Sequence, residues 1–162
     1  FAKRDTMEVA GLVKQRLDAG IDFAFIDVVG VGAGVVDRLR EMGYAAQVIP
    51  VNAGESALDE GKYFNKRAEM YGVLREWLKE QPAQLPDDDA VQADLCVTQY
   101  KYTSNSQYKL ESKDDLKKRL GRSPDRGDAI ALTFAEPVAG RSMDISRYKR
   151  AHARSGGGSW MG

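Results

Sequence analysis

Three aspartates are the residues of this sequence best suited to catalytic chemistry. Asp27 stands in the apolar run FAFIDVV at 23–29. An unpaired carboxylate is costly to bury, so we expect Asp27 where a strand ends, beside a cation. Asp125 and Asp128 are three residues apart at the start of a predicted apolar helix and should face the same side. Three carboxylates in a chain with one histidine and one cysteine suit a hard cation such as Mg²⁺ or Mn²⁺. In the alternative interpretation the three acids are structural. Asp27 then stabilises a turn, and Asp125 and Asp128 interact favourably with the helix dipole.

A basic patch lies directly before the helix acids. The net charge of the whole chain is zero, but residues 1–100 carry −6 and residues 101–162 carry +6. A basic half on a neutral chain suggests a surface that faces a polyanion, and lysines and arginines this dense match phosphate contacts. The alternative is a solvated face that acids elsewhere balance. The candidate DNA-binding residues are Lys113, Lys117, Lys118, Arg119, Arg122 and Arg126.

The first half of the chain predicts the elements that position Asp27. Periodic apolar residues predict a helix over 5–19, and the apolar run predicts a strand over 23–29. A glycine-rich turn at 30–34, a helix ending at Met42 and a strand over 46–51 follow. The order strand, turn, helix, strand is a βαβ unit, which predicts a parallel pair of strands.

The second half predicts helices around one hairpin. The elements are a helix over 63–80, a short helix opening at Asp87–Asp89, a hairpin of strands 97–103 and 107–111, a basic helix capped by Ser112, and a last helix ending near Phe134. The apolar stripe of the first of these helices is Met70, Val73, Leu74, Trp77 and Leu78. The hairpin carries alternating tyrosines at 100, 102 and 108, for which packing is favoured over a role as stacking platforms. The fold class is therefore α/β, with one domain over 1–135 and a flexible C-terminal tail over 136–162.

Composition excludes several classes of protein. The chain has 162 residues, 43% of them apolar, which suits one domain with its own core. No apolar run approaches the roughly 18–20 residues that span a bilayer. One cysteine allows no internal disulfide, and we expect a reducing compartment.

The glycine-rich segment GVGAG at 30–34 offers another interpretation, a small-molecule-binding α/β domain. A dinucleotide-binding turn needs a third glycine three residues after the second, where this sequence has Val35. The acidic residue expected about 20 positions later is also absent, because Asn52 and Ala53 stand there. A dinucleotide site is therefore the least favoured interpretation.

Three blocks of the sequence resemble the nuclease domain of phage terminase large subunits. They are FIDVVGVGAGVVDRLREMGY at 25–44, FNKRAEMYGVLREWL at 64–78 and KLESKDDLKKRLGRSPDRGDAIALTF at 109–134. The blocks cover over a third of the chain in the order of the family. The resemblance implies a ribonuclease H-like fold, in which helices flank a mixed sheet. It also implies two-metal cleavage of double-stranded viral DNA during genome packaging.

The resemblance assigns roles to individual residues. Asp27 matches the acid on the second catalytic strand of the family, and Asp128 matches the acid on its closing helix, with Asp125 as a neighbour that helps. The first acid of the family lies on an opening strand, before the helix that begins here near Asp5. We expect the opening strands to be missing from this chain, which should then cleave DNA weakly on its own.

The resemblance also implies partners and a location. The partners are double-stranded DNA, the ATPase domain of the parent chain, the portal and the small terminase subunit, in the host cytoplasm and without a membrane. The runner-up hypothesis is a non-catalytic DNA-binding or docking module of the packaging motor, in which the acids are structural.

Overall fold

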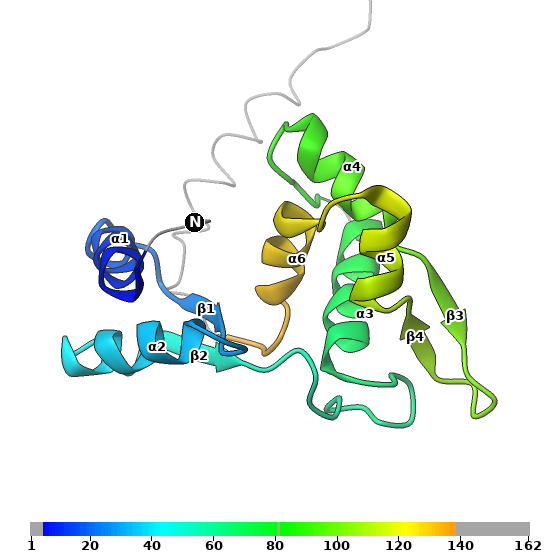
Figure 1. Cartoon of the computed structure of the whole chain (residues 1–162), viewed down its shortest axis with the longest axis horizontal. Helices are drawn as coiled ribbons and strands as arrows, with labels where there is room; N and C mark the ends of the chain where they lie inside the picture. The colour runs from blue at the N-terminus through cyan, green and yellow to red at the C-terminus, as the bar shows by residue number, and fades with distance from the viewer. Residues whose placement is uncertain (1–4, 81, 139–162) are drawn as a thin grey trace, which may run out of the picture.

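The computed structural model describes residues 5–80 and 82–138, which form two packed halves. The first half contains α1 (Thr6–Asp18), β1 (Ala24–Asp27), α2 (Gly32–Glu41) and β2 (Val48–Val51) (Figure 1). β1 and β2 are parallel, with Ala24 opposite Val48 and Asp27 opposite Val51. The predicted βαβ unit is therefore confirmed, with strands shorter than expected.

The two helices of the first half share one apolar core, and α1 has a side-chain cap. Asp5 caps α1, since its Oδ1 accepts a hydrogen bond from the amide of Glu8 at 2.8 Å. α1 packs on α2, and α2 also packs on both strands. The buried apolar residues of this core are Ala10, Leu17, Val35, Val36, Leu39 and Val48.

The turn between β1 and α2 requires a glycine at position 32. A Cβ at Gly32 would overlap the carbonyl oxygen of Asp27 and would lie 3.5 Å from the side chain of Ile26. Only a residue without a Cβ lets α2 begin directly against the end of β1. Packing therefore accounts for Gly32 without a bound dinucleotide.

The second half surrounds one long helix. It contains α3 (Lys66–Lys79), α4 (Asp89–Val97), β3 (Tyr100–Tyr102), β4 (Tyr108–Leu110), α5 (Lys113–Leu120) and α6 (Asp125–Leu132). β3 and β4 form the predicted antiparallel hairpin, which packs through β4 on α3. Ser112 caps α5 as predicted, because its Oγ accepts a hydrogen bond from the amide of Asp115 at 3.0 Å.

Helix α6 joins the two halves. It packs on α3 and α4 in the second half and on β1 in the first, and Figure 1 shows it in the middle of the molecule. Ala131 of α6 is buried together with apolar residues of α3, β2 and β4 in the second core. The relative placement of the two halves therefore depends on this helix.

The α/β class is confirmed, but the expected mixed sheet is not seen among the described residues. The four strands there form two separate sheets of two strands, one parallel and one antiparallel. α3 and α6 lie between the two sheets in Figure 1. The strands are three or four residues long, and residues of both pairs, among them Val51 of β2 and Leu110 of β4, contribute to one core.

Two further expectations concern the ends of the chain and membranes. The predicted tail over 136–162 lies, from residue 139 on, outside the described residues, so the domain boundary at 135 stays a prediction. Within 5–80 and 82–138, no helix is long and apolar enough to cross a membrane.

Helix α3 follows the predicted apolar stripe only in part. Met70 and Leu74 are buried and Trp77 is partly buried, but Val73 and Leu78 are exposed. The buried positions of α3 are residues 66–72 and Leu74, so its first two turns are buried on every side. Both α6 and β4 pack on α3, which contributes to this burial.

The difference in burial predicts different costs for two neighbouring truncations. Leu74 is 2% exposed and Val73 is 40% exposed. We expect Leu74→Ala to lower the free energy of unfolding by about 2–5 kcal/mol, because it leaves a cavity in the core. The matched control Val73→Ala should change it by about 0.5 kcal/mol or less. Urea unfolding of both variants measures the difference, and equal costs would contradict this description of α3.

Candidate active site

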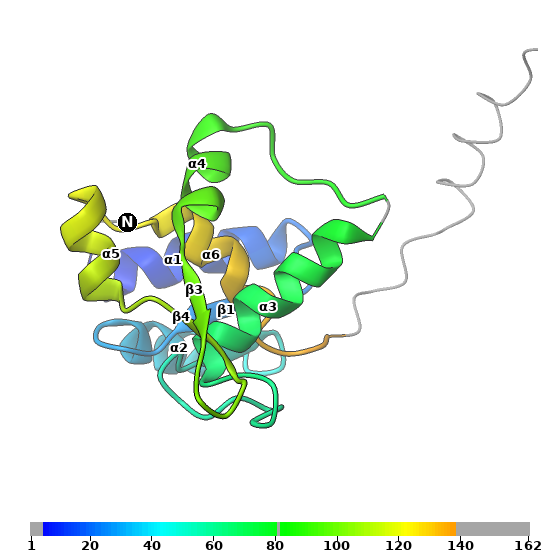
Figure 2. The ribbon, with the colours of Figure 1, turned by 90° about the vertical axis from the view of Figure 1, so that its right-hand side faces the viewer.

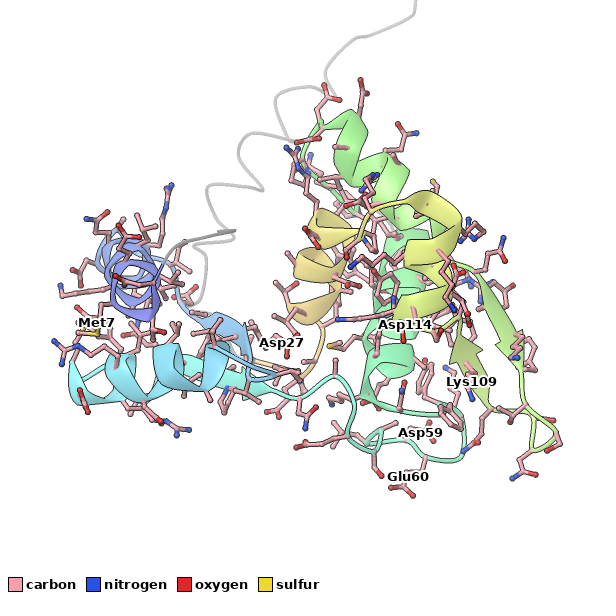
Figure 3. The ribbon with its side chains drawn as sticks, viewed as in Figure 1. Met7, Asp27, Asp59, Glu60, Lys109 and Asp114 are labelled. Carbon is pink, nitrogen blue, oxygen red and sulfur yellow. The ribbon has the colours of Figure 1, made fainter. Side chains whose placement is uncertain are left out.

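The three candidate aspartates line one cavity between the two halves. The cavity has a volume of about 270 Å³ and is lined by Asp27, Asp125 and Asp128 together with Ala53, Arg67, Met70, Lys113, Ala129 and Leu132. Asp27 comes from the carboxyl end of β1, at the edge where parallel strands present ligand sites, and Figure 3 shows it on the side of the first half that faces the second. Asp27 and Asp128, which are 101 positions apart in the sequence, thus line one cavity.

Asp27 is partly buried and holds the turn that follows its strand. Its Oδ1 accepts a hydrogen bond from the amide of Val29 at 3.0 Å, an Asx-turn contact. The close approach of Gly32 to its carbonyl oxygen fixes its backbone. A structural role and a ligand role are both compatible with this position, because the second carboxylate oxygen is not used in the turn.

Asp128 lies among a hydroxyl and two cations. Tyr71 donates its hydroxyl hydrogen to Oδ1 of Asp128 at 2.7 Å. A guanidinium nitrogen of Arg67 lies 3.6 Å from the same oxygen, and Nζ of Lys113 lies 3.6 Å from Oδ2. Burial and the neighbouring Asp128 carboxylate raise the pKa of the Tyr71 hydroxyl well above its usual value, so this hydroxyl stays protonated and acts as a donor.

Arg67 is the functional candidate that sequence reasoning missed. Its side chain is buried, and Nη1 donates to the carbonyl oxygen of Glu111 at 2.9 Å. Within the described residues, Nε and Nη2 have no hydrogen-bond partner. The guanidinium therefore supplies a fixed positive charge beneath Asp128. A signal was present in the sequence, since Arg67 precedes Met70, Tyr71 and Leu74 at helical spacing and so lies on an apolar stripe.

Asp94 is a second missed residue, and it fixes the start of α6. Its side chain is 1% exposed, and its carboxylate accepts from the guanidinium of Arg122 at 2.5 Å and from the amide of Arg126 at 3.0 Å. The amide of Gly127 donates at 3.3 Å. A Cβ at Gly127 would lie 3.0 Å from Cβ of Asp94, so a glycine allows this close approach. Because Pro124 makes no side-chain cap, Asp94 acts as the cap from another helix.

The six predicted DNA-binding residues differ in how they are engaged. Arg119 pairs with Glu111, Arg122 with Asp94, Arg126 with Asp88, and Lys113 with Asp128. Lys117 and Lys118 are exposed, and in the described ranges no ion pair involves either of them. The three arginines and Lys113 therefore already have acidic partners, whereas Lys117 and Lys118 do not.

A larger cavity of about 470 Å³ adjoins the first. The two cavities share Asp27, Ala53, Arg67 and Lys113. The larger one continues to Phe64 and Lys109, where Nζ of Lys109 lies 3.7 Å from the centre of the Phe64 ring. The candidate site is therefore one end of a longer depression that runs toward the hairpin.

The donors fit Mg²⁺ or Mn²⁺ in chemical type. Carboxylate oxygens are the ligands that these hard cations prefer. Across residues 5–80 and 82–138, however, no group of three or more His, Cys, Asp or Glu side chains is close enough to hold an ion. Asp27 and Asp128 thus supply part of a ligand set, and the metal-binding role of these two and of Asp125 stays a prediction.

The fold and the cavity define a class of α/β domain, one in which acids from a strand end and from a later helix meet between two halves. The particular fold is shared with the nuclease domain of a phage terminase large subunit, so the resemblance expected from the sequence is confirmed. The structure of the nuclease domain of the large terminase subunit gp2 of bacterial virus Sf6 has a TM-score of 0.61 at 20% identity, over 80% of this chain and 71% of that chain.

Two structures of a lysine-to-alanine mutant of the same viral domain are also similar. The one with manganese has a TM-score of 0.62 at 21% identity, over 80% of this chain and 72% of that chain. The one with calcium has a TM-score of 0.62 at 21% identity, over 80% and 71% of the two chains. The sequence matches no protein-family model and no curated protein.

The cap of α6 predicts an acid-sensitive contribution to stability. Burial alone would raise the pKa of the Asp94 carboxyl, but the hydrogen bonds from the Arg122 guanidinium and two α6 amides hold it below its usual 3.8. A depressed pKa contributes stability that is complete above pH 3.8 and is lost as the pH falls through the lower value of the folded state. We expect Asp94→Asn to lower the free energy of unfolding at pH 7 by about 1–3 kcal/mol.

The measurement is denaturant unfolding of wild type and variant over a range of pH. The difference between them should shrink as the medium becomes more acidic, because wild type loses the ionised carboxylate that the variant already lacks. Asp87→Asn, in the exposed loop before α4, is the matched control and should follow wild type. A difference that does not change with pH would show that Asp94 acts through packing alone.

Proposed function

We propose that this chain is a metal-dependent endodeoxyribonuclease domain with a ribonuclease H-like fold, from the large subunit of a viral DNA-packaging terminase. In this proposal it cuts concatemeric double-stranded DNA by two-metal hydrolysis. The observation that carries the proposal is the cavity in which Asp27 of β1 meets Asp125 and Asp128 of α6. The similarity to a terminase nuclease domain with manganese supports the choice of reaction and of metal.

Asp27 and Asp128 would hold Mg²⁺ or Mn²⁺, with Asp125 as a neighbour at the start of α6. Bound divalent cations would polarise the attacking water and stabilise the leaving oxygen of the phosphodiester. Before a cation binds, Arg67 and Lys113 balance the charge of Asp128. Lys113 is half exposed and can turn toward a phosphate, whereas buried Arg67 keeps its position.

The surface around the cavity suits the backbone of DNA. Lys113 lies on the cavity wall, and Lys117 and Lys118 follow it on α5. Lysines contact phosphates without reading bases, so the proposed binding is independent of sequence. In the packaging motor the further partners would be the ATPase domain of the parent chain, the portal and the small terminase subunit, in the host cytoplasm.

One observation favours a second candidate function, a non-catalytic DNA-binding or docking module. Asp128 accepts a hydrogen bond from Tyr71 and lies near two cations, and Asp27 stabilises its own turn. Acids with such partners can be purely structural. Binding of a divalent cation separates the two functions, because the docking module does not need it.

Metal binding provides the direct test. We expect Mn²⁺ to bind wild type, and Asp27→Asn and Asp128→Asn each to weaken binding by about tenfold or more, since each removes an anionic ligand. Asp125→Asn should weaken it less. Asp114→Asn, at the exposed start of α5 (Figure 3), is the matched control and should bind Mn²⁺ as wild type does. Calorimetric titration measures all five proteins.

A plasmid-nicking assay gives the second readout. Whatever rate of Mn²⁺-dependent nicking wild type shows, Asp27→Asn and Asp128→Asn should reduce it to background while DNA binding persists. Nicking that survives Asp27→Asn would show that the active site lies elsewhere. No binding of Mn²⁺ to wild type would leave the docking module as the better description, and binding that survives both substitutions would show that the metal site lies elsewhere.

The basic patch predicts a graded dependence of DNA affinity on salt. Each phosphate contact should add about −0.9 to the slope of log affinity against log salt concentration. We expect Lys117→Ala and Lys118→Ala each to reduce the slope by about 0.9 without loss of stability. Arg122→Ala should mainly lower stability, because it removes the partner of buried Asp94. Fluorescence anisotropy at several salt concentrations checks this, and a flat salt response of wild type would contradict it.

A further inference from the structure

The β3–β4 hairpin carries an aromatic cluster that the core only partly uses. Tyr63, Tyr100, Tyr102 and Tyr108 lie together, with ring centres 4.8–6.2 Å apart. Tyr63 and Tyr108 are buried, but Tyr100 is 48% exposed and Tyr102 is 62% exposed. An inner pair of rings therefore supports an outer pair that faces solvent, and the rings of Tyr100 and Tyr108, 4.8 Å apart and tilted by 30°, connect the two pairs.

The charge of the hairpin is unusual for a solvent-facing element. Residues 99–110 contain two lysines and no acid. These lysines, Lys101 and Lys109, are directly opposite each other in the β3–β4 register. Like charges in that arrangement destabilise a hairpin. Arg75 of α3 adds a third cation, with its guanidinium carbon 5.5 Å from the centre of the Tyr100 ring.

We propose that this hairpin binds an unpaired DNA strand, with bases stacked on Tyr100 and Tyr102 and a phosphate held by Arg75, the cation on the same face as the rings. Exposed aromatic rings beside cations are the features of surfaces that bind single strands without sequence preference. In an intact duplex the bases already stack on each other, so their faces are not available to stack on the two tyrosines. The absence of acids on the hairpin provides the charge complementarity to phosphate.

The position of the hairpin relates it to the candidate active site. Lys109 of β4 also lines the larger cavity, which reaches Asp27. In Figure 1 the hairpin lies on the side of the molecule away from α1 and α2, and in Figure 2 that side faces the viewer, with no other element in front of β3. If cleavage beside Asp27 and Asp128 produced a DNA end with unpaired strands, the exposed hairpin would lie near that end. The inference goes beyond the proposed cleavage and does not require it.

Anisotropy with two labelled probes tests the hairpin in the presence of EDTA, so that no strand is cut. The probes are an oligothymidine of about 12 nucleotides and a blunt duplex of the same length. We expect Tyr102→Ala to weaken oligothymidine binding about fivefold or more, since it removes a stacking face, and to change duplex binding by less than about twofold. Tyr102→Phe keeps the ring and should bind both probes as wild type does.

Two further variants separate stacking from charge. Arg75→Ala should reduce the salt slope for oligothymidine by about 0.7, whereas Tyr102→Ala should lower the affinity and leave the slope unchanged. Arg40→Ala, an exposed cation on α2 in the other half, is the matched control and should bind as wild type does. Circular dichroism of each variant verifies that the fold is kept.

Three outcomes would overturn the proposal. The first is that Tyr102→Ala binds oligothymidine as tightly as wild type does. The second is that Tyr102→Ala loses the same affinity for the duplex as for oligothymidine. The third is that a glutamate-rich peptide displaces oligothymidine and binds Tyr102→Ala less well than wild type, which would make the hairpin a peptide site. Asp128→Asn distinguishes this proposal from the proposed cleavage. It should bind oligothymidine normally, and its nicking activity bears on the cleavage alone.

Discussion

The buried carboxylate of Asp94 is the constraint on which the rest of this structure depends. It comes from α4 and accepts hydrogen bonds from the first amides of α6 and from Arg122. α6 in turn packs on β1 and carries Asp128. The position of Asp128 relative to Asp27 thus depends on the ionised Asp94 carboxylate, which contacts neither of these two acids. A charge buried for this purpose is tolerated because all of its hydrogen bonds are made within the fold.

The groups around Asp128 hold its carboxylate in place and leave it able to bind a cation. Tyr71 and Arg67 fix the carboxylate from the buried side, and Lys113 approaches from the exposed side. The two cations compensate one negative charge that would otherwise be costly next to Asp125 and Asp27. If Lys113 moves away from Asp128, Arg67 stays in place. The Asp128 carboxylate can therefore exchange Lys113 for a metal ion and keep its orientation.

Much of this arrangement could be predicted from local sequence, and the rest depends on contacts that no local pattern shows. The βαβ unit was clear from the run at 23–29, the glycines after it and the apolar strand at 46–51. The placement of Asp27 at a strand end and of Asp128 at a helix start followed from the same local patterns. Asp94 could not be predicted, because its partners are 28–33 residues away in the sequence. The single mixed sheet is not confirmed, because the described strands form two separate pairs.

The contact between Gly32 and the backbone of Asp27 has a consequence for mutational scans of this protein. Any side chain at position 32 must displace the last carbonyl of β1 and with it the Asp27 carboxylate. In a selection for activity, Gly32 would therefore rank among the least replaceable positions, and its tolerance profile would resemble that of Asp27 itself. Intolerance to every substitution, including alanine, would then identify a steric contact with the backbone rather than a residue that takes part in the reaction.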